Sequence, residues 1–108
     1  MKDVTIDLRQ YRSGGSRVFA GRQRGEEVRS KAGLGRLDLA DVRVSVVIPD
    51  DTFSLTSFFF LGMFGPSIRA LGRDGFRAKY CFSGPDFGDL IQDGIDEALR
   101  TSSPLRAA

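Results

Sequence analysis

The residues with the clearest potential for chemistry are three hydroxyls close together in the middle of the chain. Ser54, Thr56 and Ser57 lie within four residues, shortly after Asp50 and Asp51. A serine or threonine at a helix start caps the helix, because its oxygen accepts a hydrogen bond from a free amide. The same helix end attracts phosphate, and phosphorylation there would add about two negative charges. Capping and a regulatory modification are therefore both open interpretations of this cluster.

A run of three phenylalanines follows the hydroxyls directly: Phe58, Phe59 and Phe60. Successive residues of a helix point about 100° apart, so three such rings cannot all face one core. We expect two of them to be buried and at least one to be partly exposed. An exposed aromatic patch indicates a protein contact, whereas burial of the run in the core is the alternative.

The first third of the chain is rich in arginine, and Arg17, Arg22 and Arg24 fall on its predicted helix. A solvated helix face is the simplest interpretation of such a segment. The functional alternative is a surface that binds an acidic partner or an anion. Nucleic acid is disfavoured, because few aromatic residues are interleaved with the arginines and the net charge is only +2.

The sequence contains none of the common catalytic patterns. It has no histidine, which removes the commonest general base and the commonest metal ligand. No glycine-rich nucleotide fingerprint is present, and the lone Cys81 lies in a predicted strand with no histidine to activate it. We therefore predict a protein that is not an enzyme and has no catalytic residue, cofactor or metal site.

The elements that must position these residues alternate between strands and helices. Strands are predicted over residues 3–8, 43–48 and 76–82. Helices are predicted over 17–32, with Ser16 as N-cap, and over 57–71 and 86–100. The segment 37–41 is compatible with a connector or a short strand, and Gly65-Pro66 predicts a kink in the second helix. The alternation favours an α/β fold with a mostly parallel or mixed sheet.

The loop Asp50–Ser57 is the expected functional end of this fold. It follows Val44–Ile48, an apolar and β-branched run that indicates a buried strand. In an open α/β sheet, the loop after a central strand is where ligands and partners bind. Residues 1–100 are expected to form one domain and 101–108 a flexible tail. No apolar run is long enough to span a membrane and no signal peptide is visible, so we expect a cytoplasmic protein.

Three features of the chain together resemble the STAS-like domain family, a relative of the STAS domains of anti-sigma-factor antagonists. They are a Ser-Arg opening of the first helix, an apolar strand leading into a turn, and a Ser-Phe helix start. The residues concerned are Ser16-Arg17 with Gly21, Val44–Ile48, and Thr56-Ser57-Phe58 with Leu61, Phe64 and Gly65. The resemblance covers about residues 3–100.

This resemblance implies a small single-domain sandwich with a four- or five-stranded mixed sheet and about three helices. It also implies a regulatory domain without enzymatic activity that binds a protein, typically an ATPase-type kinase related to histidine kinases. In the antagonist family the kinase phosphorylates a Ser or Thr at the start of the second helix, and Thr56 and Ser57 match that position. Family members usually carry Asp directly after the central strand, where this chain has Pro49.

Two other functions stay open at this point. The chain is also compatible with a structural module that forms a homodimer through the Phe-rich second helix. A third interpretation is a domain that binds a small anion or nucleotide at the amides of that helix start. In all three, the second helix and the loop before it are the functional region.

Overall fold

The fold is built on a three-stranded parallel sheet with the order β1-β3-β5. Its strands are β1 (Lys2–Asp7), β3 (Val42–Val47) and β5 (Tyr80–Ser83). A separate parallel pair joins β2 (Val18–Phe19) to β4 (Ser54–Leu55). The computed structural model describes residues 2–12 and 14–100. Within them, the expected single sheet of four or five strands is divided into these two all-parallel sheets.

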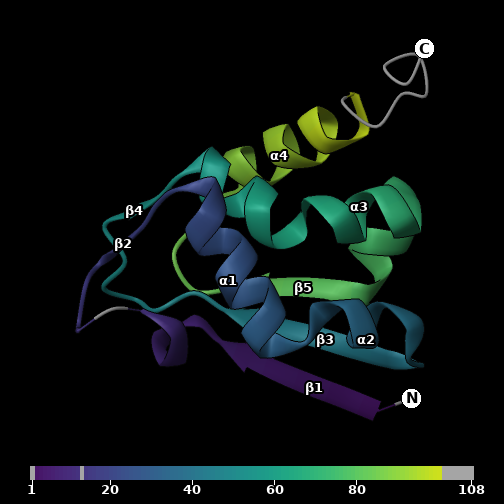
Figure 1. Ribbon diagram of the computed structural model, residues 1–108, viewed down its shortest axis with the longest axis horizontal. Helices are drawn as coiled ribbons and strands as arrows, with labels where there is room; N and C mark the ends of the chain where they lie inside the picture. Colours follow the sequence, from purple (N-terminus) through teal and green to yellow (C-terminus); the bar gives the residue numbers. More distant parts are fainter. Residues whose placement is uncertain (1, 13, 101–108) are drawn as a thin grey trace.

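All the α-helices lie on one side of the three-stranded sheet, as Figure 1 shows. This gives a two-layer α/β arrangement, with one helix more than the three expected. A 3-10 turn, η1 (Leu8–Tyr11), follows β1. The α-helices are α1 (Arg22–Ala32), α2 (Leu34–Leu39), α3 (Ser57–Lys79) and α4 (Gly88–Arg100).

The two faces of the sheet differ as the alternation of strand residues requires. Val44 and Val46 are buried beneath the helices, and Tyr80 and Phe82 pair with them on the same face. The opposite face is not covered by any described element. It consists mainly of polar residues in three rows: Asp3 and Arg43; Thr5, Ser45 and Cys81; Asp7, Val47 and Ser83.

The helix layer is held together by a close crossing of α1 and α3. A Cβ added at Gly25 would lie 2.2 Å from the Phe59 carbonyl oxygen, and one at Gly62 would lie 2.2 Å from the Arg22 carbonyl oxygen. Only glycine permits backbones to approach so closely. These two glycines thus bring α1 against α3 rather than against the sheet.

The predicted start of the first helix was wrong. Ser16 resembles an N-cap, but its oxygen accepts a hydrogen bond from the Val18 amide (3.2 Å) in a local turn. Residues 18–19 then form β2, and the Phe19 side chain is only 2% exposed. The helix begins three residues after Phe19, at Arg22. The β2–β4 pairing and the burial of Phe19 outweigh the local preference for helix. The predicted end at residue 32 is confirmed, with Gly33 as the C-cap.

Two further boundaries differ from prediction. Of the segment 37–41, predicted as a connector or a short strand, residues 37–39 form the end of helix α2 and residues 40–41 connect it to β3. Residues 76–79, expected in a strand, belong to the last turn of α3, and β5 begins only at Tyr80. The interruption of α3 also lies elsewhere, since its one non-helical residue is Gly72 (φ 79°, ψ 171°) and not Pro66. Proline already has a helical φ, whereas the Gly72 conformation strongly favours glycine.

Strands 3–8 and 43–48 and the last helix were predicted correctly to within two residues. The predicted tail, 101–108, lies outside the described residues. Among those that the structure describes, no helix combines the length and apolar character needed to cross a membrane.

Candidate functional site

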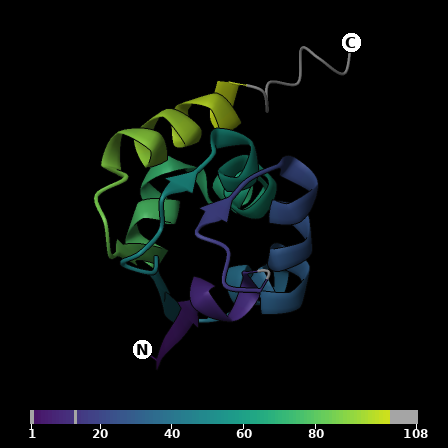
Figure 2. The ribbon, with the colours of Figure 1, turned by 90° about the vertical axis from the view of Figure 1, so that its left-hand side faces the viewer.

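The candidate site lies where the three parallel strands end and the long helices begin. β3 is the central strand, and the chain leaves it through Pro49, a turn at Asp50-Asp51, and β4 before entering α3. Figure 2 looks onto this end, where β2 and β4 lie in front of α3. The predicted order of central strand, polar loop and hydroxyl-bearing helix start is therefore present.

Thr56 is the N-cap of α3, so the capping interpretation is confirmed for this residue. Its side-chain oxygen accepts hydrogen bonds from the Phe59 amide (3.2 Å) and the Gly21 amide (3.4 Å). Gly21 is in turn the N-cap of α1. One hydroxyl thus ties the first turns of two helices together, and Thr56 is only partly exposed.

The other two hydroxyls of the cluster have different surroundings. Ser57 is the first residue of α3 and is exposed. Ser54 lies in β4, paired with Val18, and is partly buried. Of the three, Ser57 is therefore the hydroxyl that a modifying enzyme could reach most easily.

The three phenylalanines divide as expected. Phe58 is 62% exposed, whereas Phe59 and Phe60 are at most 1% exposed. Phe59 packs against Phe19, with ring centroids 5.4 Å apart. Phe59 and Phe60 therefore belong to the core, and only Phe58 is available to a partner.

A second exposed aromatic, Phe53, was missed by the sequence analysis. It is 76% exposed, just before β4, and its amide donates to the Arg17 carbonyl oxygen (2.7 Å). Val18, beside it on β2, is 43% exposed. The signal was present in the sequence, since a phenylalanine between Thr52 and Ser54 interrupts a polar turn. We name Phe53, Ser57 and Phe58 the α3-start surface.

A groove of about 650 Å³ adjoins this surface between the beginning of α3 and α4. Phe58, Leu61 and Leu90 give it an apolar lining, and Ser57 and Arg22 stand at its rim. Acidic side chains line it from α4, among them Asp93. The groove combines apolar contact area with charges of both signs, as protein contact surfaces commonly do.

The acidic residues of the predicted site are not equivalent. Asp51 forms an ion pair with Arg12 (2.8 Å), which joins the turn after β3 to the end of η1. The hydrogen bond that Arg12 donates in this pair lowers the pKa of the Asp51 carboxyl below its ordinary value. Asp50 is exposed in the same turn. Asp51 thus helps to hold the loop, and Asp50 faces solvent.

The predicted arginine surface is also divided. Arg17 is exposed beside Phe53, and Arg22 is exposed at the start of α1. Arg24 instead donates to the Glu27 carboxylate (3.0 Å) and to the Tyr11 carbonyl oxygen. Arg17 and Arg22 border the α3-start surface, whereas Arg24 is engaged within the fold.

A buried polar cluster that the sequence analysis missed lies under the helices. The Asp38 carboxylate accepts hydrogen bonds from the hydroxyls of Ser67 (2.5 Å) and Tyr80 (2.5 Å). It also forms an ion pair with Arg29 (3.3 Å). Arg29 also donates to the Ser67 oxygen (2.7 Å). The signal was Ser67 itself, which falls on the apolar face of its helix and is 0% exposed.

This cluster joins four elements and its members satisfy one another. Burial, followed by the hydrogen bond to Asp38, raises the pKa of the Tyr80 phenol well above its ordinary value. A closed network of this kind specifies how elements pack, and we assign it a structural role. No group of three or more His, Cys, Asp or Glu residues suited to a metal ion occurs within residues 2–12 and 14–100.

Comparisons of this chain with protein-family models, with curated proteins and with solved structures find no match.

Proposed function

We propose that this chain is a non-catalytic regulatory domain that binds a protein partner through the α3-start surface. The observation that carries the proposal is the exposure of two aromatic rings, Phe53 and Phe58, at the end where β3 delivers the chain to α3. Large exposed aromatics are unfavourable in water and are enriched at protein contacts. The groove beside Phe58 offers a partner further apolar area.

The resemblance to STAS-like domains supplies the class of partner. By that resemblance, the partner is an ATPase-type kinase related to histidine kinases. The family position for phosphorylation corresponds to Thr56 and Ser57. Because the Thr56 hydroxyl caps α3 and also accepts from the Gly21 amide at the start of α1, the proposal assigns the modification to Ser57.

A phosphate on Ser57 would act on the fold and on binding in opposite directions. At the first position of α3 its negative charge would be favourable to the helix. In the groove it would lie near the carboxylates of α4 and would need to be desolvated beneath a partner. Phosphorylation would therefore weaken partner binding without unfolding the domain.

The test begins with capture of the partner from the native host, followed by titration of the purified partner. We expect Phe53→Ser/Phe58→Ser to weaken its affinity at least about tenfold, because exposed aromatic anchors each contribute on the order of 1–2 kcal/mol or more. Leu39→Ser is the matched control, since Leu39 is 91% exposed but lies on α2, at the other end of the molecule in Figure 1.

The control also defines the result that would contradict the proposal. If Leu39→Ser weakens binding as much as the double aromatic variant does, the α3-start surface is not the contact. The same conclusion would follow if the natural protein, the double aromatic variant and Leu39→Ser all bound the partner with equal affinity. Urea denaturation of each variant verifies that it remains folded under the conditions of titration.

A further inference from the structure

The outer edge of β5 is unusually well suited to pairing with another strand. The Ser83 carbonyl oxygen accepts from the Ile48 amide (2.8 Å), so Ser83 directs its backbone groups towards β3. Because these groups alternate along a strand, those of Phe82 point away from β3. Within the described residues, no backbone donor or acceptor forms a hydrogen bond with the Phe82 amide or carbonyl. An exposed edge of this kind is a template for strand addition.

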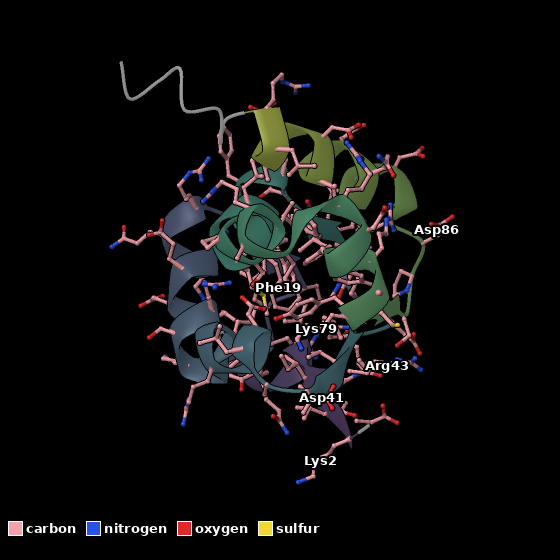
Figure 3. All side chains as sticks on the ribbon, turned by 90° about the vertical axis from the view of Figure 1, so that its right-hand side faces the viewer. Lys2, Phe19, Asp41, Arg43, Lys79 and Asp86 are labelled. Atoms are coloured by element: carbon pink, nitrogen blue, oxygen red, sulfur yellow. The ribbon has the colours of Figure 1, made fainter. Side chains whose placement is uncertain are left out.

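The space beside this edge is open. A groove of about 550 Å³ runs along β5, bordered by the loop from Gly84 to Gly88 and by Ile91 of α4. Arg77, near the end of α3, and Asp86, in the loop after β5, both line the groove. Figure 3 shows Asp86 at the outside of the molecule, below α4.

The other edge of the sheet is protected in the way that natural edge strands usually are. β1 carries Lys2, Asp3 and Asp7, and charged side chains discourage strand pairing. β5 has no charged residue among its four. The contrast selects β5 as the edge at which the sheet can be extended.

The charges at the two ends of β5 indicate which strand would fit. Lys79, directly before the strand, donates to the carbonyl oxygens of Ala40 and Val42 on the β3 side. The next cation is Arg77, in the last turn of α3, whose guanidinium donates to Gln92 (2.7 Å), and Asp86 follows the strand in the loop. An antiparallel neighbour with the same charges would place its acidic end beside Arg77 and its basic end beside Asp86. A second copy of this chain provides that strand, and the pairing satisfies both ends at once through a two-fold axis, the commonest symmetry of protein dimers.

We propose that two copies of the chain form a dimer by antiparallel pairing of their β5 strands about a two-fold axis at Phe82. The Phe82 amide of each copy donates to the Phe82 carbonyl oxygen of the other. The two sheets become one sheet of six strands. The surface is distinct from the α3-start surface, so the dimer leaves Phe53 and Phe58 accessible.

This register makes a specific prediction about side chains. Cys81 of one copy lies opposite the partner's Ser83 on the uncovered face, as a non-hydrogen-bonded pair with Cα atoms about 4.5 Å apart. The two Cys81 residues are diagonal neighbours, about 7–8 Å apart. A disulfide suits the first separation and not the second.

The experiment combines light scattering with cross-linking of the full chain. A ¹⁵N-labelled Cys81→Ser/Ser83→Cys variant is mixed in equal amounts with the unlabelled protein and oxidised with glutathione disulfide. Random pairing would make half of all cross-links mixed disulfides, which join Cys81 of the natural chain to the thiol introduced at position 83. We expect the mixed disulfide to exceed that half clearly. Light scattering of the reduced protein should give twice the mass of one chain.

A charge exchange tests the same geometry independently of cysteine chemistry. Arg77→Glu should weaken dimerisation about tenfold by setting like charges at both ends, and Arg77→Glu/Asp86→Arg should restore it. Phe58→Ser should leave the dimer unchanged. A monomer at all concentrations up to about 0.5 mM, a random disulfide distribution, or a dimer lost with Phe58→Ser but not with Arg77→Glu would overturn the proposal.

Discussion

Thr56 and Ser57 are adjacent hydroxyls with different physical roles. Thr56 accepts hydrogen bonds from the amides that begin α1 and α3, while Ser57 is exposed on the first turn of α3. A hydroxyl that caps one helix and also binds the start of another contributes to stability and is poorly placed for modification. The neighbouring Ser57 hydroxyl does not cap a helix and can take part in recognition of a partner.

The two hydroxyls should therefore respond differently to removal. Thr56→Ala should lower the free energy of unfolding by about 1 kcal/mol, because two helix-start amides lose their acceptor. Ser57→Ala should change it by less than about 0.5 kcal/mol, as expected for an exposed site. Urea denaturation measures both, and an equal loss in the two variants would refute this division of roles.

A glutamate at position 57 should separate stability from binding. Ser57→Glu places a negative charge at the start of α3 and should leave the free energy of unfolding unchanged or raise it by up to about 1 kcal/mol. The same variant should bind the partner more weakly than Ser57→Gln, which has the same size without the charge. Binding that is equal for the two variants would speak against an electrostatic switch at Ser57.

Tyr80 should make the stability of the protein depend on high pH. Its phenol keeps its proton in the folded state above pH 10, where the unfolded chain loses it, because burial and the hydrogen bond to Asp38 raise its pKa. Unfolding then releases a proton, so the free energy of unfolding falls as pH rises, by up to about 1.4 kcal/mol per pH unit above pH ~10.

The Tyr80→Phe variant isolates this effect. At pH 7 it should be less stable than the natural protein by about 1–3 kcal/mol, since Asp38 loses a donor. The difference should shrink as the pH rises from about 10 to 11.5, because the variant lacks the titrating phenol. Thermal or urea denaturation across this range provides the measurement, and a pH-independent difference would contradict the assignment.

At the scale of elements, the parts that could be predicted were those whose local pattern and tertiary role agree. The β-branched run before Pro49 forms β3, and the helix predicted over 86–100 forms α4. β2 could not be predicted, because a two-residue strand has no periodicity and Ser16 mimics a helix cap. In the second helix, the predicted end at residue 71 coincides with the interruption at Gly72, whereas the kink predicted at Pro66 is absent.

The crossing of α1 over α3 gives the sharpest prediction at this scale. Gly62→Ala would set a methyl group against the Arg22 carbonyl oxygen and should cost about 1–3 kcal/mol or more through displacement of α1. Gly35→Ala is the control, because nothing lies within 4 Å of its added Cβ and alanine favours the helix by about 1 kcal/mol. Thermal unfolding should separate the two variants by several degrees; equal midpoints would contradict the described crossing.

At the scale of the whole molecule, the position of the candidate site followed from topology, while its shape did not. Alternating strands and helices place the loop after β3 at the carboxyl end of the sheet, which in open α/β folds is the usual ligand-binding end, and this placement of the loop was predicted. The exposure of Phe53 and the groove between α3 and α4 arise from how distant segments meet. The same is true of the uncovered sheet face and the open β5 edge, which depend on where the helix layer ends.

The most direct test of the central claim is a backbone hydrogen-exchange comparison of the chain alone and saturated with its purified partner. The proposed contact predicts slower exchange for amides of residues 52–61 and 17–22, with α2 unchanged. Protection confined to α2, or to the uncovered face of the three-stranded sheet, would contradict binding through the α3-start surface.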